Sequence, residues 1–247
     1  MGTSPTDEVP PSARRLATTR WSVVLGAATE TEEANVALEE LCRLYWFPVY
    51  AYIRRRGHPA EDSADLTQGF FHRLVDRRSL AGIRREGGRF RSFLLAAVEN
   101  FLANDYHRRH AQKRGGGQEL LSLDSCDPEG RYALDTPDSD TPETLFQKRW
   151  ALALLQEATD RLSRECARAG KGDLFEALHG HLLEHGASEP YAILAGRLGM
   201  SEGALKVAVH RLRSRLGLLL REMIADTVTE PGEIDTELRH LIAVLGR

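Results

Sequence analysis

The sequence contains few cysteines and lacks a long apolar run. Its three cysteines, Cys42, Cys126 and Cys166, lie far apart in 247 residues, so the chain has neither a disulfide framework nor a CxxC metal-binding motif. No eighteen consecutive apolar residues occur, which excludes a conventional membrane-spanning helix. The first fifteen residues lack the apolar core of a signal peptide. These absences favour a cytoplasmic protein that has no membrane partner.

Alternating apolar patterns of strand length are also absent, as are internal repeats. Apolar residues recur at helical spacing instead, and their share of 42%, with 28% charged residues, is typical of a globular chain. We therefore predict an all-α fold. The formal net charge is only −3, which excludes a uniformly basic nucleic-acid-binding protein but leaves room for local basic patches.

Changes in composition divide the chain into five segments. Residues 1–17 are rich in proline, serine, threonine and charge, which predicts a disordered tail. Helical patterning predicts one small domain over 18–115 and a second over 144–226, followed by a C-terminal helical extension over 227–247. The two predicted domains are separated by residues 116–143, whose composition differs from that of both.

This intervening segment is strongly acidic. Between Glu119 and Glu143 there are eight acidic residues, one arginine and three prolines, so the local net charge is −7. Such a composition predicts a flexible, extended acidic linker over 116–143. A solvated spacer is the simpler interpretation of this linker. The alternative is that it mimics nucleic acid or enters a basic channel.

Residues 190–220 match the pattern of a helix-turn-helix. Ala195 is small enough for close helix packing, Gly199 tolerates the left-handed turn conformation, and Ser201 is a suitable N-cap for the second helix. Between Glu189 and Arg221, six basic residues outnumber two acidic ones. The candidate DNA-contacting residues are Ser201, Glu202, Gly203, Lys206, His210, Arg211, Arg213 and Arg215. An ordinary helical hairpin with a solvated basic face is the alternative.

The residue types in this second helix suit the reading of a duplex. Lys206 can donate to guanine or to phosphate, and Glu202 can accept from cytosine. Arg211, Arg213 and Arg215 can hold phosphates and fix the register of the protein on DNA.

A second basic element occupies residues 84–114, where eight basic residues face three acidic ones. Four aromatic residues interleave with them, and basic groups beside aromatic rings can bind single-stranded nucleic acid. The helical spacing of Phe93, Val98 and Phe101 indicates that the aromatics are mostly core residues. The candidate contacts to single-stranded DNA are Arg89, Arg91, Asn100, Asn104, Arg108, Arg109, Lys113 and Arg114.

Three motifs together resemble a known family. The stretches EDSADLTQGFF and RSFLLAAVENFLANDYHRR, followed by the helix-turn-helix pattern, are similar to a bacterial RNA polymerase sigma factor of the sigma-70 family, extracytoplasmic-function type, over roughly residues 19–225. The resemblance implies that Asp62, Asp65 and Gln68 bind polymerase. It also implies that the basic helix melts and reads the −10 element, and that the helix-turn-helix reads the −35 element. The segment between Asn100 and Asn104 falls where the family places a loop that captures a flipped base.

The resemblance also implies the partners of the chain. These would be core RNA polymerase, through its β′ clamp and β flap, promoter DNA, and an anti-sigma factor or another regulator. The C-terminal extension and the acidic linker depart from the minimal family, and Phe93 stands where the family usually has tryptophan. Two other classes of function stay open: a stand-alone helix-turn-helix regulator, and an interaction protein without a role on DNA.

No set of catalytic residues accompanies these motifs, so we expect neither catalysis nor a cofactor. His181 and His185 have the i, i+4 spacing of two zinc ligands, but the glutamate of an HExxH motif and a third ligand are missing. We therefore expect no metal site. The three glycines at 115–117 lack the lysine of a P-loop and predict a hinge.

Overall fold

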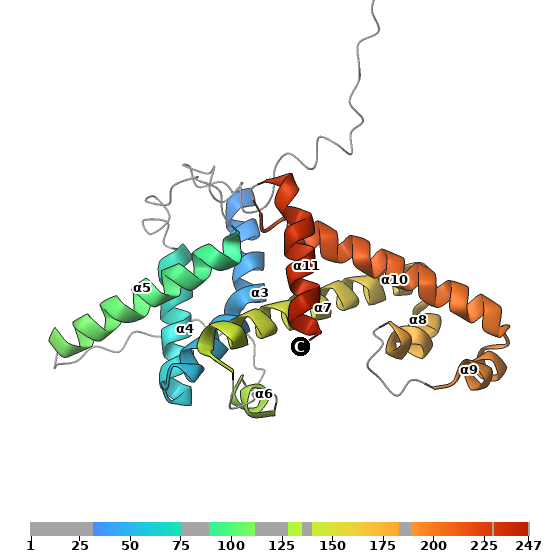
Figure 1. Ribbon diagram of the computed structural model, residues 1–247, viewed down its shortest axis with the longest axis horizontal. Helices are drawn as coiled ribbons and strands as arrows, with labels where there is room; N and C mark the ends of the chain where they lie inside the picture. Colours follow the sequence, from blue (N-terminus) through green and yellow to red (C-terminus); the bar gives the residue numbers. More distant parts are fainter. Residues whose placement is uncertain are drawn as a thin grey trace, which may run out of the picture. The chain divides into compact units, whose positions relative to one another are not determined.

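The computed structural model describes residues 32–75, 89–111, 128–134, 140–182, 189–228 and 230–246 (Figure 1). Within these ranges all regular structure is helical and no strand occurs, which confirms the predicted all-α class. The α-helices are α3 (Glu32–Arg55), α4 (Ala60–Val75), α5 (Phe90–Ala111), α6 (Pro128–Leu134), α7 (Pro142–Arg168), α8 (Gly172–Leu178), α9 (Tyr191–Leu198), α10 (Glu202–Ala225) and α11 (Ile234–Leu245). Two short 3-10 helices, η2 (His179–His181) and η3 (Pro231–Glu233), complete the set in the described part. None of the described helices is both long and apolar enough to cross a bilayer.

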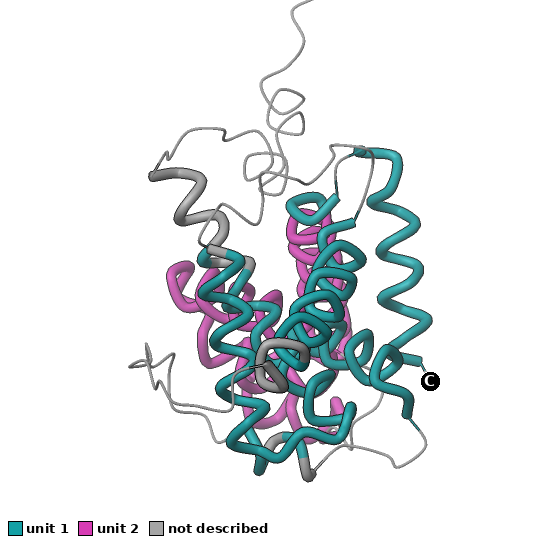
Figure 2. The backbone as a smooth tube through the Cα atoms, turned by 90° about the vertical axis from the view of Figure 1, so that its left-hand side faces the viewer, with its two compact units in different colours: residues 1–153, 225–247 teal, residues 154–224 magenta. Residues whose placement is uncertain are grey.

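The chain forms two compact units, which Figure 2 distinguishes by colour. Unit 2 comprises residues 154–224, and unit 1 comprises the described residues before and after that range. The boundaries therefore lie inside α7 and near the end of α10, whereas the sequence predicted a boundary at the linker 116–143. The first half of α7 belongs to unit 1 because its aromatic side chains pack there. Phe146, for example, lies 6.4 Å from both Tyr45 and Tyr52, measured between ring centroids.

Unit 1 is built around α3, which runs without interruption through Pro48. No new helix starts at this proline. An internal proline removes one helical hydrogen bond and costs about 3 kcal/mol. Val49, Tyr50 and Ala51, which follow it, are all fully buried, so tertiary packing offsets this cost.

Helices α4 and α5 pack with α3 through apolar faces, in which Phe93 and Phe101, expected in the core, are only half-buried. In α4, Leu66, Phe70 and Leu74 are buried, and the backbone N–H of Ser63 donates to the Pro59 carbonyl at 2.9 Å at the start of the helix. In α5, the buried residues recur at helical spacing as Phe90, Leu94, Val98 and Leu102.

Helix α6 corrects the prediction of an extended linker. Residues 128–134 are helical, and Glu129 accepts hydrogen bonds from Arg54 at 2.5 and 2.9 Å and from the Tyr50 hydroxyl at 2.6 Å. The Arg54 guanidinium also lies 5.1 Å from the centre of the Tyr132 ring. This part of the segment is ordered because Glu129 and Tyr132 find specific partners on α3. The linker residues 116–127 and 135–139 lie outside the described residues, as do the predicted tail 1–17 and hinge 115–117.

Unit 2 has its own small core, formed by Leu178, Leu194, Leu205 and Val209 from α8, α9 and α10. The last helix, α11, spans Ile234–Leu245 as its amphipathic pattern predicted, and it belongs to unit 1.

Candidate nucleic-acid interface

Helices α9 and α10 in unit 2 are joined by a three-residue turn. Gly199 has φ 64° and ψ 28°, the left-handed conformation in which glycine avoids the clash of a side chain. The backbone N–H of Met200 donates to the Ala195 carbonyl at 3.1 Å, and the Ser201 hydroxyl accepts from the N–H of Ala204 at 3.2 Å. Gly199 and Ser201 therefore have the turn and capping roles that the sequence predicted for them.

The face of α10 opposite Leu205 and Val209 is open to solvent. Most of the candidate DNA-contacting residues are exposed on it or in the turn before it: Ser201, Glu202, Gly203, Lys206, His210, Arg211 and Arg213. The aliphatic side chain of Val207 is also 51% exposed there. The structure thus presents basic groups along one helix that a three-residue turn attaches to α9.

Lys206 is held only loosely. Its ammonium lies 3.9 Å from the Glu202 carboxylate and 5.8 Å from the centre of the Tyr191 ring, and its side chain is 63% exposed. Tyr191 in turn stacks on His181, with 4.5 Å between the ring centroids. Exposed ion pairs of this kind contribute little to stability, so Lys206 can exchange the Glu202 carboxylate for an anion of a binding partner at a low cost in free energy.

Arg213 and Arg215, which the sequence assigned to phosphate contacts, also have partners within unit 2. Arg215 donates to both oxygens of Glu165 at 2.7 and 2.8 Å and to Glu222 at 3.2 Å. These hydrogen bonds raise the pKa of Arg215 and lower the pKa of Glu165. Arg213 donates twice to the His181 carbonyl, at 2.9 and 3.1 Å, while its side chain stays exposed. Arg215 therefore links α10 to α7, and Arg213 links α10 to the end of η2.

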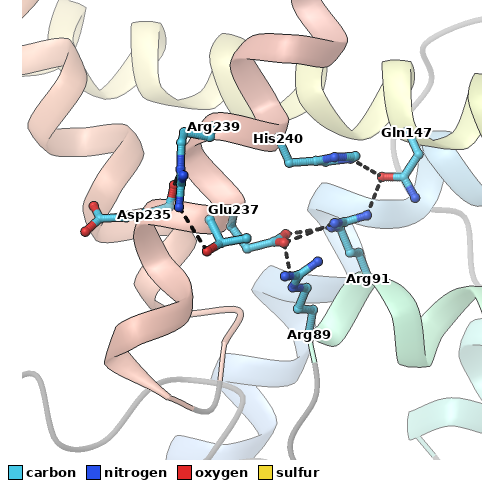
Figure 3. Close-up of polar contacts among 8 residues, drawn as sticks. Arg89, Arg91, Gln147, Asp235, Glu237, Arg239 and His240 are labelled. Atoms are coloured by element: carbon cyan, nitrogen blue, oxygen red, sulfur yellow. Dashed lines mark hydrogen bonds and ion pairs between the residues drawn. The ribbon is translucent and has the colours of Figure 1, made fainter.

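In unit 1, Arg91 is buried, whereas the sequence placed it at a DNA surface. Only 5% of the residue is exposed, and its guanidinium donates to both oxygens of Glu237 at 2.6 and 3.0 Å and to Gln147 at 2.6 Å (Figure 3). The guanidinium also lies 5.1 Å from the centre of the Trp150 ring. In this arrangement Arg91 is enclosed by residues of α11 and α7, and its contact with DNA stays a prediction.

Arg89 shares the same carboxylate. Its Nε lies 2.7 Å from Glu237, and its side chain is 32% exposed. Sequence reasoning missed Glu237 altogether, although a signal existed. Glu237 lies three residues after Ile234 and four before Leu241, so it interrupts the apolar stripe of α11, and all three residues are buried. An acid on the apolar face of a helix indicates a buried partner.

Helix α5 is continuous from Phe90 to Ala111, so the segment between Asn100 and Asn104 is not a loop. Both asparagines are exposed on the helix. The segment between them stays helical because Leu102 is buried and the Phe101 ring packs against Phe70, with centroids 5.7 Å apart. Arg108 and Arg109 lie in α5, but their side chains are outside the described part, as are Lys113 and Arg114 entirely.

The candidate polymerase-binding residues line α4. Asp65 is exposed, and Asp62 and Gln68 are half-buried. These three residues follow one another at intervals of three along α4. Asp65 lies on the exposed side, whereas Asp62 lies one turn before the buried Leu66.

The Arg54–Glu129 contact between α3 and α6 is a second feature that the sequence did not reveal. Hydrogen bonding from Arg54 lowers the pKa of the Glu129 carboxyl to about 2. The pKa of Cys42, by contrast, rises to about 12 through burial, which makes this thiol unreactive at neutral pH.

The histidine cluster does not form a metal centre in the part of the chain that the structure describes. No group of three or more potential ligands occurs there. His179 and His181 lie in η2, where His181 stacks on Tyr191, and His185 is outside the described ranges.

No protein-family model matches the chain, and neither a curated protein nor a solved structure matches it. We therefore infer the function of the chain from its residues and their geometry.

Proposed function

We propose that the chain is a transcription initiation factor of the sigma-70 family, extracytoplasmic-function type. In this proposal it acts in the cytoplasm, binds core RNA polymerase at the β′ clamp and the β flap, and directs it to specific promoters. It has no enzymatic activity of its own, and an anti-sigma factor or another regulator is a further candidate partner.

The observation that carries this proposal is the exposed face of α10. Lys206, His210 and Arg211 follow a capped three-residue turn, and all three side chains are exposed. A helix presented in this way suits the major groove, where its N-terminal residues meet base edges. In the proposal this face reads the −35 duplex, while the exposed Asn100 and Asn104 of α5 contact the melted −10 strand.

A stand-alone helix-turn-helix regulator would need only α9 and α10, so α4 separates the two functions. The exposed carboxylate of Asp65, with Asp62 and Gln68 beside it, gives α4 an acidic docking surface. A repressor that binds its operator alone has no use for such a surface. Binding to core polymerase is thus the discriminating property.

The test is co-purification with core RNA polymerase, followed by run-off transcription from a supplied promoter library. We expect a complex at moderate salt, and we expect Asp65→Lys to abolish it while the circular dichroism spectrum stays unchanged. Glu176→Lys, an equal charge reversal at an exposed position of α8, is the matched control and should bind normally. If the unaltered chain forms no complex but binds a duplex tightly, the stand-alone regulator is the better description.

A further inference from the structure

Glu237 of α11 holds two arginines from the start of α5, and the sequence assigned both of those arginines to DNA. The two guanidinium groups converge on one carboxylate, at 2.6–3.0 Å from Arg91 and 2.7 Å from Arg89. Figure 3 shows both side chains pointing from α5 toward Glu237. One negative charge thus faces two positive ones, and the cluster keeps an excess positive charge.

The neighbourhood of this cluster is polar. Gln147 accepts from Arg91 at 2.6 Å and lies 3.2 Å from the Nε2 atom of His240, so Gln147 connects α11 to α7 as well. The backbone N–H of Phe90, at the start of α5, donates to the Thr227 carbonyl at 2.9 Å. Residues 227–240 therefore cover the N-terminal end of α5 with hydrogen bonds and charge, and they also bury the apolar side chains of Val228 and Ile234.

A phosphodiester can replace the Glu237 carboxylate in its contact with the two arginines. The planar fork of an arginine matches the oxygens of a carboxylate and of a phosphodiester equally well. Both anions carry one negative charge, so exchanging one for the other leaves the charge of the cluster unchanged. A buried ion pair also adds little net stability compared with an apolar contact of the same size, which limits the free energy needed to open it.

We propose that Arg89 and Arg91 form a closed binding site for a phosphate of single-stranded DNA, and that α11 closes it with the Glu237 carboxylate. When the DNA strand arrives, α11 moves away and the strand takes the place of Glu237. The C-terminal helix is in this way an intramolecular competitor of the promoter strand. This inference rests on the proposed function, because it assumes that the basic end of α5 meets DNA.

The first experiment measures the affinity of the full-length chain for a short fluorescein-labelled single-stranded DNA at several salt concentrations. Glu237→Gln keeps the shape of the side chain and removes its charge, so we expect binding about tenfold tighter than that of the unaltered chain at low salt. The dependence of log K on log salt should steepen by about 0.7 for each arginine that gains a phosphate contact. Asp235→Asn removes the same charge from an exposed position on α11 and should change the affinity by less than about twofold.

A triple variant serves as the control, and its affinity for single-stranded DNA should return to that of the unaltered chain. Glu237→Gln combined with Arg89→Gln and Arg91→Gln should lose the gain. If Glu237→Gln, folded by circular dichroism, binds no more tightly than Asp235→Asn, the proposal is overturned. A gain that survives in the triple variant overturns it too, since the site would lie elsewhere.

A second measurement uses the unaltered chain and decides the question even if Glu237→Gln fails to fold. Hydrogen exchange at the backbone amides of α11 should accelerate when saturating oligonucleotide is added, because the helix leaves its contacts. Unchanged or slower exchange in α11 would overturn the proposal. Neither measurement involves polymerase, so the two proposals can fail separately. If the DNA measurements agree with these expectations but the chain does not bind polymerase, only the proposed function is refuted. If the chain binds polymerase but the DNA measurements disagree, only this inference is refuted.

Discussion

Arg54 and Arg91 of unit 1 are held very differently from Lys206 and Arg211 of unit 2. In unit 1, Arg54 and Arg91 are held by carboxylates that lie 75 and 146 residues away in the sequence. In unit 2, Lys206 and Arg211 extend from α10 into solvent. Yet by composition the first unit has the more basic stretch, since residues 84–114 carry a net charge of +5 and residues 189–221 a net charge of +4. Local charge therefore indicates where anions are attracted, and burial decides which residues can reach them.

This difference has a physical reason. Exposed cations keep their hydration and are held loosely, so they can exchange partners quickly. An arginine that is 5% exposed has lost most of its hydration and needs a fixed counter-charge. Arg91 is thus a structural residue while α11 is in place, whereas Lys206 is exposed and, under the proposed function, available to bind DNA. The following predictions test that contrast.

The largest expected effect is on the stability of unit 1. Arg91→Ala leaves the buried Glu237 with only Arg89 as a counter-charge, and breaking a buried pair in this way costs about 3 kcal/mol. Urea unfolding followed by circular dichroism measures this loss. Lys206→Ala is the comparison variant in unit 2, and its unfolding free energy should stay within about 0.5 kcal/mol of that of the unaltered chain. Equal stabilities of the two variants would contradict the contrast between the units.

The next effect concerns DNA affinity through unit 2. Truncation of Lys206 to alanine should cost on the order of 1–3 kcal/mol in binding to a selected −35 duplex and should relax the preference at one base pair. Competition with duplexes that differ at single positions measures both quantities. A uniform loss across all the sequences would instead assign Lys206 to a phosphate.

A smaller effect separates two arginines of α10. Arg211→Ala should weaken binding to all duplexes and reduce the salt slope by about one unit, because Arg211 is exposed. Arg215→Ala should leave the salt slope nearly unchanged and lower the unfolding free energy by about 1 kcal/mol, since Arg215 is bound to Glu165 and Glu222. Parallel salt titrations and urea unfolding of the two variants check this, and identical salt slopes would count against the structural role of Arg215.

The sequence predicted those features whose cause is local. The 3.6-residue spacing of apolar side chains predicted helices in the stretches that contain α5 and α11, and a glycine followed two residues later by a serine identified the turn at Gly199 and its cap at Ser201. Such signals depend on a few neighbouring residues, so they can be read from one sequence. The exposure of Lys206 followed from the same periodicity.

Features that depend on distant partners could not be predicted in this way. The sequence of α5 does not reveal that Arg91 meets an acid 146 residues later, because periodicity places a side chain on a face without identifying what covers that face. The same holds for α6, whose Glu129 is one of eight acids in its segment and differs from the others only by its donors on α3. The sign of a charge run can therefore be counted from the sequence, but the partners and the burial of its individual residues cannot.

The smallest expected effect is the pH dependence of the α3–α6 contact. Hydrogen bonding from Arg54 lowers the pKa of Glu129 to about 2 from an ordinary value of 4.5, so the folded state binds the proton less readily than the unfolded state does. The contact therefore stabilises the fold fully above about pH 4.5 and loses this contribution as the pH falls toward about 2. The Glu129 side chain is 37% exposed, so solvent screening keeps the contribution below about 1 kcal/mol.

The difference in unfolding free energy between the unaltered chain and Glu129→Gln should be constant from pH 7 to about 5 and should shrink at lower pH. A difference that grows on acidification would mean that the Arg54 contact favours the protonated form of Glu129, and the contrast between held and exposed charges would then fail at this site.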